Sequence, residues 1–261
     1  MLSNSDRTVD RATICSFDLL GVQVSVVNLS VAIDLLEQRV KQRRRGYVCA
    51  SPVSSIVEAH RNAAYKMVLN KAYMVVPDGM PVAWVGKCQG FTEIGRTYGP
   101  DLMLGLCGKG LETGMRHFFY GGTTKSNEML VNRLRFMFPD IVIAGIYSPS
   151  AISEDYLESV DIIREINDTK PDVIWVGLGS PKQDFWMSNH RSQLSAPLMV
   201  GVGAAFDFLS GQKLQAPLWM RNNGLEWLFR FLCEPRRLWR RYLLGNSYFV
   251  YLLLRQILLS R

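Results

Sequence analysis

Short apolar runs alternate with amphipathic stretches through the first 210 residues. The apolar runs predict strands at 22–27, 47–50, 73–76, 117–120, 141–146, 172–176 and 198–202. Apolar residues at helical spacing predict helices at 30–42, 53–69, 80–87, 100–110, 125–137, 153–167 and 181–193. Strands and helices that alternate at these lengths are typical of a Rossmann-like α/β fold, with a mostly parallel sheet and helices on both faces.

Beyond residue 218 the pattern changes to helices with a basic face. Pro235 is expected to begin one of them. On that helix four arginines share one face, namely Arg236, Arg237, Arg240 and Arg241. Leucine and aromatic residues lie roughly opposite, at Leu238, Trp239, Tyr242 and Leu243. The sequence therefore predicts a basic, helical C-terminal appendage.

Nearly all of the net charge of +7 belongs to this appendage, because 221–261 contains eight arginines and two glutamates. A basic tail implies an anionic partner, such as lipid head groups, a diphosphate or nucleic acid. Interfacial tryptophan and tyrosine favour an anionic membrane surface. The alternative is a helix docked on the core with a solvated basic face. No nucleic-acid partner is expected, since no known binding module is present.

The cysteine pattern and the N-terminus favour a cytoplasmic protein. Five cysteines occur, with no pair at Cys-x-x-Cys spacing. The first 13 residues are polar and lack the apolar segment of a signal peptide. The apolar stretch 248–259 contains Arg255 and is shorter than the about 20 residues that a spanning helix needs. We expect it to lie on a surface or to pack on the core.

Ligands of parallel sheets bind at the carboxyl ends of the strands, so residues that follow strands are the candidates for chemistry. Asp78 stands between Pro77 and Gly79 after a predicted strand. A carboxylate there suits a general base, although Asp-Gly is also a common turn. Arg96, flanked by Gly95 in a predicted loop, suits a diphosphate, or is a solvated surface residue.

Glycines end three predicted strands, at Gly121-Gly122, Gly177-x-Gly179 and Gly201-x-Gly203. Freed backbone amides at a helix start suit phosphate, but a tight strand-to-helix turn explains them equally well. None completes a dinucleotide fingerprint. Ser180 and Pro181 are typical of a helix start, which leaves Lys182 and Gln183 unexplained.

Metal and serine-hydrolase chemistry find no support in the sequence. The three histidines are scattered, with no Cys or His at metal-ligand spacing. Neither an Asp-x-Asp nor a Gly-x-Ser-x-Gly motif occurs. We therefore expect no metal site.

Together these segments resemble the WecG/TagA/CpsF glycosyltransferases, family 26 in the usual classification, from about residue 20 to 242. The resemblance is carried by the order and spacing of several motifs: Val76-Pro77-Asp78-Gly79-Met80, Val176-Gly177-Leu178-Gly179-Ser180-Pro181-Lys182-Gln183-Asp184-x-Trp186, Gly201-Val202-Gly203-Ala204-Ala205-Phe206-Asp207-Phe208, Ala216-Pro217-x-Trp219, and Gly224-Leu225-Glu226-Trp227-Leu228-x-Arg230 running on to Tyr242.

The resemblance implies an inverting transfer, without metal or cofactor, from a UDP-sugar to a polyprenyl-diphosphate-linked saccharide for cell-surface or exopolysaccharide synthesis. Asp78 looks like the general base and Arg96 a diphosphate contact. Further substrate contacts would come from Ser51, Gly121, Gly122, Gly179, Gln183 and Asp207. The arginines Arg236, Arg237, Arg240 and Arg241 would face the diphosphate or the membrane.

The implied organisation is a flexible tail at 1–13, a catalytic nucleotide-sugar-binding domain at 14–218 and a membrane-associating appendage at 219–261. The protein would be peripheral on the inner face of the plasma membrane. The oligomeric state is left open, including a homo-oligomer in which the tail of one subunit closes the site of its neighbour.

One departure from the family concerns the segment after the second strand. Ser51-Pro52-Val53 stands where the family often has Thr-Pro-Asn, so Val53 lacks the amide's hydrogen bonds. This favours a hexose donor over N-acetylmannosamine. Two alternatives to a transferase are a non-catalytic adaptor that binds a nucleotide and a membrane, and a nicotinamide-dependent oxidoreductase. The incomplete glycine fingerprints disfavour the oxidoreductase.

Overall fold

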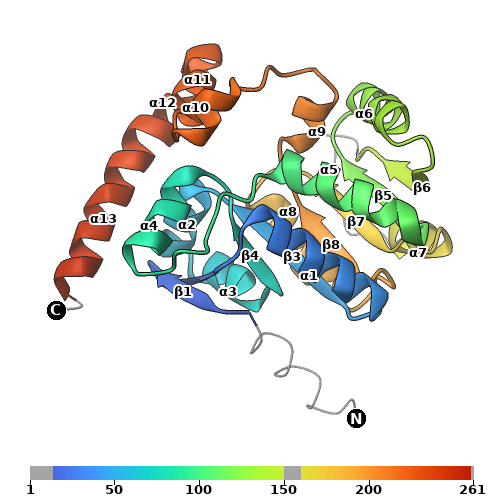
Figure 1. Cartoon of the computed structure of the whole chain (residues 1–261), viewed down its shortest axis with the longest axis horizontal. Helices are drawn as coiled ribbons and strands as arrows, with labels where there is room; N and C mark the ends of the chain where they lie inside the picture. Colours follow the sequence, from blue (N-terminus) through green and yellow to red (C-terminus); the bar gives the residue numbers. More distant parts are fainter. Residues whose placement is uncertain (1–13, 150–159, 260–261) are drawn as a thin grey trace, which may run out of the picture. The chain divides into compact units, whose positions relative to one another are not determined.

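The computed structural model describes residues 14–149 and 160–259 and has an α/β fold (Figure 1). Its larger sheet is parallel and has the strand order β4-β3-β8-β7-β5-β6, while β1 and β2 form a separate antiparallel pair. The predicted fold class is confirmed. The expected tail at 1–13 and the first part of the expected helix at 153–167 lie outside the described residues. The strands are β1 (Ser16–Leu19), β2 (Val22–Ser25), β3 (Gly46–Ser51), β4 (Met74–Pro77), β5 (Arg116–Gly121), β6 (Val142–Tyr147), β7 (Val173–Gly177) and β8 (Leu198–Gly201).

The chain divides into two compact units. The first unit comprises Met1–Asn28, Ser51–Thr97 and Ala216–Arg261, and the second comprises Leu29–Ala50 and Tyr98–Gln215. The C-terminal segment thus belongs to the same unit as the segment that carries Asp78. The domain boundary expected at 218 stays a prediction.

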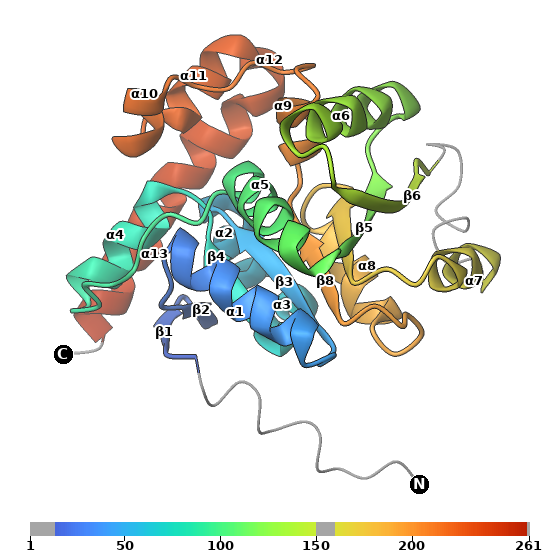
Figure 2. The ribbon, with the colours of Figure 1, turned by 45° about the vertical axis from the view of Figure 1, so that its right-hand side comes forward.

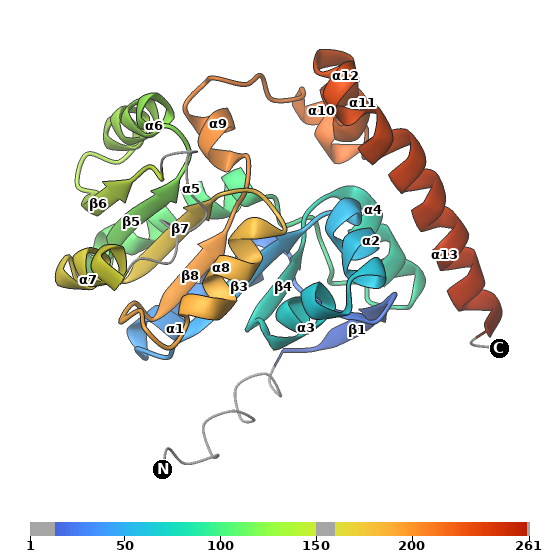
Figure 3. The same ribbon diagram turned by 180° about the vertical axis from the view of Figure 1, so that it is seen from behind.

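The second unit contains five of the parallel strands. Helices α1 (Leu29–Lys41) and α5 (Gly99–Gly110) cover one face of its sheet, and α8 (Lys182–His190) covers the other (Figures 1 and 3). Strands covered on both faces must be apolar throughout, which explains runs such as 173–176. The register aligns Gly121 with Gly177, and Val176 with Gly201, so three glycine-bearing strand ends lie side by side. The other helices of this unit are α6 (Thr124–Met137), α7 (Val160–Asp168) and α9 (Ala205–Leu209).

In the first unit, the expected single helix at 53–69 is wrong. Two helices, α2 (Val53–Arg61) and α3 (Ala63–Lys71), are separated by Asn62, whose backbone is extended. The side chain of Asn62 accepts a hydrogen bond from the amide of Tyr65 and so caps α3. Apolar spacing continues across this break, which is why periodicity alone joined the two helices. Helix α4 (Met80–Cys88) follows β4 directly.

The pattern of apolar residues also missed strand β1. Its four residues pair with β2 through a tight turn at Leu20 and Gly21, both of which have positive φ. The burial of β1 alternates, but a run of four residues is too short to separate a strand from a loop by period.

The C-terminal segment folds into α10 (Leu218–Asn222), α11 (Glu226–Cys233), α12 (Pro235–Trp239), a π-helical turn (Arg240–Leu244) and α13 (Gly245–Leu259) (Figure 2). Helix α13 packs beside α2, and its residues Phe249 and Leu252 are buried. The guanidinium of Arg61 lies 4.4 Å from the ring centre of Tyr248. Along the described residues, no helix is both long enough and apolar enough to cross a membrane.

Candidate active site

Asp78 stands where strand β4 ends, in the first unit. The four residues of β4 are buried, and the proline at its end stops the strand. The amide of Asp78 donates a hydrogen bond to the carbonyl of Ser51 at the end of β3, 3.4 Å away. Gly79, with φ of 116°, turns the chain directly into α4. The carboxylate is therefore fixed at the carboxyl end of a strand, where the sequence placed it.

The environment of Asp78 raises the pKa of its carboxyl group from 3.8 to about 7. The main cause is loss of hydration, and the second is the negative charge of Glu226. Arg230, Arg96 and Arg241 act in the opposite direction. A carboxylate with a pKa near neutrality is ionised in a large fraction of molecules at pH 7 and still binds a proton well, which is what a general base requires.

Arg96 forms an ion pair with Glu226, the first residue of α11. The Nη1 atom of Arg96 lies 3.1 Å from Oε2 of Glu226, and the two side chains are only 10% and 16% exposed. The loop residue Arg96 was predicted from the sequence, whereas Glu226 and Arg230 were not singled out as site residues. Only their place in the GLEWLxR motif pointed to them.

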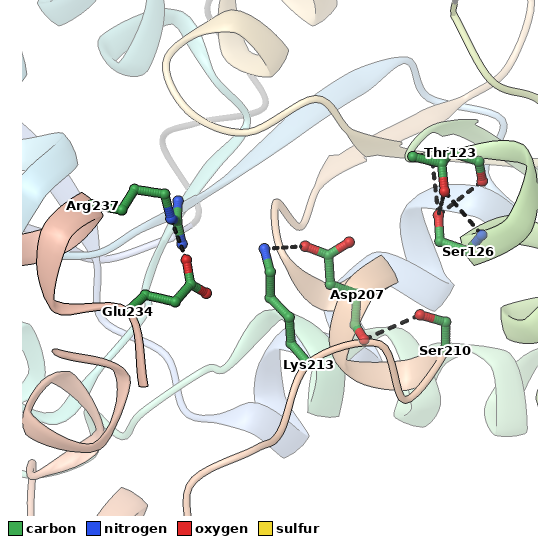
Figure 4. Close-up of polar contacts among 7 residues, drawn as sticks. All are labelled: Thr123, Ser126, Asp207, Ser210, Lys213, Glu234 and Arg237. Carbon is green, nitrogen blue, oxygen red and sulfur yellow. Dashed lines mark hydrogen bonds and ion pairs between the residues drawn. The ribbon is translucent and has the colours of Figure 1, made fainter. Parts of the chain in front are cut away.

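The four arginines predicted to share a face differ in their surroundings. Arg241 donates hydrogen bonds from Nε (3.1 Å) and Nη2 (2.6 Å) to the hydroxyl of Ser54. Arg240 lies 5.2 Å from the ring centre of Trp239, and Arg237 pairs with Glu234 (Figure 4). Arg236 is exposed. The π-helical turn begins at Arg240, so the spacing assumed for one regular helix is interrupted there.

In the second unit, the glycines at the strand ends permit a close approach of two backbones. Gly121 has φ of 124°, and a Cβ atom there would lie 2.6 Å from the carbonyl carbon of Gly177. The amide of Gly122 donates to the carbonyl of Gly177 at 3.2 Å. Gly121 therefore cannot carry a side chain without a backbone shift.

Gln183 links two of these strand ends. Its Oε1 atom accepts hydrogen bonds from the amides of Gly179 (3.2 Å) and Gly203 (2.9 Å), and its Nε2 donates to Ser180 at 3.2 Å. The side chain is 1% exposed. These hydrogen bonds explain why a polar residue stands at position 183, which helix capping did not explain. Its predicted contact with substrate stays a prediction.

Asp207 is paired with Lys213, whose Nζ lies 2.6 Å from Oδ2 (Figure 4). Nearby in sequence, the hydroxyl of Ser210 donates to the backbone carbonyl of Asp207. The pair fixes the carboxylate that the sequence analysis assigned to substrate binding. Lys213 was not anticipated, because it lies six residues after Asp207 and outside the motif.

The first turn of α6 adds a polar group that sequence reasoning missed. Asn127 is buried, and its Nδ2 donates to the carbonyl of Gly121 and to the hydroxyl of Ser148, each at 2.7 Å. Thr123 and Ser126 form a capping box at the start of this helix (Figure 4). Side chains at the start of α6 thus hold the turn after β5 in place. Among the described residues, no group of three or more His, Cys, Asp or Glu is arranged to hold a metal ion.

Comparison with known proteins decides the family. Residues 17–261 match the Glycosyl transferase WecG/TagA/CpsF family. The chain belongs to this family. It is a glycosyltransferase, as the resemblance of its motifs implied.

Three curated relatives of this WecG/TagA/CpsF glycosyltransferase share the name N-acetylglucosaminyldiphosphoundecaprenol N-acetyl-beta-D-mannosaminyltransferase. One from Bacillus spizizenii is 35% identical, over 71% of this chain and 70% of its own length. One from Bacillus subtilis is 30% identical, over 83% of this chain and 82% of its own length. One from Staphylococcus aureus is 25% identical, over 88% of this chain and 90% of its own length.

Proposed function

We propose that this glycosyltransferase moves a sugar from a UDP-sugar onto a polyprenyl-diphosphate-linked saccharide, with inversion and without a metal ion. The observation that carries the proposal is Asp78, a carboxylate at a strand end whose pKa is raised to about 7 beside three arginines. The names of the curated relatives describe an acceptor of the same class, a saccharide on diphosphoundecaprenol.

In the proposed reaction, Asp78 takes the proton of the acceptor hydroxyl as that oxygen attacks the anomeric carbon. A new glycosidic bond forms, the bond from the anomeric carbon to the diphosphate oxygen breaks, and UDP leaves with the bonding electrons. A general base of this kind contributes roughly 10²–10⁴ in rate. A single displacement with one base inverts the anomeric centre.

The charge that develops on the leaving diphosphate needs stabilisation. Arg96, Arg230 and Arg241 gather around Asp78 within the first unit. Planar guanidinium groups pair well with phosphate oxygens. These arginines would supply the positive charge that a divalent metal ion provides in other glycosyltransferases.

The strand ends of the second unit are proposed to bind substrate through Gly121, Gly122, Gly179, Gln183 and Asp207, while Ser51 is proposed to do so in the first. Val53 stands where the family often has an asparagine, and this difference favours a hexose as the donor sugar. The curated relatives' names specify N-acetylmannosamine instead, so the donor is to be determined.

Contact with an anionic membrane surface is proposed for the C-terminal segment. Exposed apolar residues cover one side of α13 and the turn before it: Leu243, Leu244, Val250, Tyr251, Leu254, Ile257 and Leu258. Arg236, Arg240 and Arg255 are exposed on the same segment. Apolar and basic side chains in such a mixture suit a peripheral position on an anionic lipid surface.

The proposal is tested by UDP release from a panel of UDP-sugars, with a polyprenyl-diphosphate-linked mono- or disaccharide as acceptor and EDTA in the buffer. Acceptor-dependent release from one donor is expected, and the linkage of the product gives the stereochemistry. If release requires added Mg²⁺ or Mn²⁺, metal independence is wrong. UDP binding without release from any donor would favour the non-catalytic adaptor.

A further inference from the structure

Glu226 is a mostly buried carboxylate that the reaction described above does not use. It begins α11 and holds Arg96, which precedes it by 130 residues. Burying two charges costs hydration energy that their attraction does not always return. A mostly buried ion pair at this place therefore calls for a role beyond stability.

The charged groups that act on Asp78 come from three segments of the first unit. Arg96 lies in the loop after α4, Glu226 and Arg230 belong to α11, and Arg241 belongs to the π-helical turn. Three of these groups are cations, and each makes Asp78 easier to ionise. Glu226 alone among them opposes ionisation. Two carboxylates that share one site push each other's proton affinity apart, a device that enzymes use to separate acid and base roles.

We propose that Glu226 is a positioning residue for the transfer reaction: its carboxylate holds the Arg96 guanidinium and keeps a second negative charge beside Asp78, so that Asp78 can take up the acceptor's proton. This inference rests on the base role proposed for Asp78. Through Glu226, the C-terminal segment sets the proton affinity of Asp78, in addition to contributing arginines.

The physical reason is base strength. With three guanidinium groups and no second carboxylate, Asp78 would be a weaker base, ionised in more molecules at neutral pH yet poorer at accepting a proton. Removal of the Glu226 charge therefore lowers the pKa of Asp78. Arg96, released from Glu226, would be free to pair with Asp78, and such a pair would lower the pKa further.

The test is the pH dependence of kcat/KM for Glu226→Gln, measured by UDP release. Activity requires ionised Asp78, so in the wild type it rises as pH passes through about 7. In Glu226→Gln the rise should occur about one pH unit lower, with reduced activity on the plateau. Glu226→Asp, which keeps the charge, should lie close to the wild-type curve.

Glu234→Gln is the matched control. Glu234 follows the same helix, also pairs with an arginine, Arg237, and is not among the charges that act on Asp78. It should leave the midpoint of the rise unchanged. A Glu226→Gln curve that rises at the wild-type pH, or that shifts no further than Glu234→Gln, overturns the proposal.

Two further measurements separate this proposal from the one on which it rests. Full turnover by Asp78→Asn would remove the base assignment itself. Loss of turnover in Asp78→Asn together with an unshifted Glu226→Gln would leave the base and remove the role of Glu226. If Glu226→Gln does not fold, carbon-13 NMR titration of both carboxyl groups in the wild type decides. A change in the Asp78 signal at the pH where Glu226 takes up its proton supports the proposal, and an Asp78 signal that does not respond to Glu226 overturns it.

Discussion

Arg241 donates two hydrogen bonds to the hydroxyl of Ser54, which precedes it by 187 residues. The contact joins the π-helical turn of the C-terminal segment to the first turn of α2. Arg241 is also one of the three cations that lower the pKa of Asp78. The same guanidinium thus anchors the segment and acts on the proposed base.

Replacing Arg241 by methionine should move the activity profile in the direction opposite to Glu226→Gln. Loss of a cation raises the pKa of Asp78, so the rise of kcat/KM should occur above pH 7. The maximal rate should also fall, because the leaving diphosphate loses a cation. Arg255→Met, an exposed arginine on α13 that does not act on Asp78, is the control for general charge loss. Identical profiles for the two variants would contradict the assignment of Arg241.

Asp78→Asn should lower kcat by roughly 10²–10⁴ while the affinity for UDP changes little. The amide keeps the shape of the side chain but cannot accept the proton. Turnover is followed by UDP release and binding by calorimetry. Near-normal turnover would remove Asp78 from the base role.

The same variant should be more stable than the wild type at neutral and alkaline pH. The pKa of Asp78 is raised in the folded chain, so between about pH 4 and 7 the folded state holds a proton that the unfolded state has released. Wild-type stability therefore falls as the pH rises through this window, by about 1.4 kcal/mol for each unit of pKa difference, and is constant above it. Melting temperatures should show the advantage of Asp78→Asn growing from pH 4 to 7. An advantage that is constant with pH would contradict the raised pKa.

Gln183→Leu should destabilise the fold by about 1–3 kcal/mol, because the amides of Gly179 and Gly203 lose their buried acceptor. Urea unfolding measures the loss. Asn189→Ala, an exposed change on the same helix, should be nearly neutral. UDP affinity measured on the folded fraction then shows whether Gln183 also contacts substrate.

The membrane proposal is tested by Leu254→Gln with Leu258→Gln, both exposed on α13. Burying a leucine side chain contributes about 2 kcal/mol, so the double variant should bind anionic vesicles at least tenfold more weakly. Met67→Gln, an exposed apolar change on α3, is the control. If the double variant and Met67→Gln bind vesicles equally in a flotation assay, α13 does not contact lipid.

Hydrophobic spacing was sufficient to predict the alternation of strands and helices, because strands covered on both faces must be apolar. It also placed Asp78 and the glycines correctly at strand ends. It could not find the break at Asn62, where a side-chain cap rather than a change of period ends the helix.

Local sequence patterns could not predict the hydrogen-bond and ion-pair partners of the site residues. Glu226 meets Arg96 across 130 residues of sequence, and no spacing rule connects them. The hydrogen bonds of Gln183 to Gly179 and Gly203 form only when the strand ends meet, so a local pattern could not predict them. Such contacts follow from tertiary packing and become visible only in the folded chain.

The position of Glu226, Arg230 and Arg241 has a consequence for biosynthesis. A ribosome that has made the chain as far as residue 220 has already produced Asp78 and the three glycine-bearing strand ends. The four charges that act on Asp78 are then represented by Arg96 alone. The nascent protein is therefore expected to remain inert while it is made, and to gain its activity only when residues 221–261 have emerged and folded with the rest of the first unit.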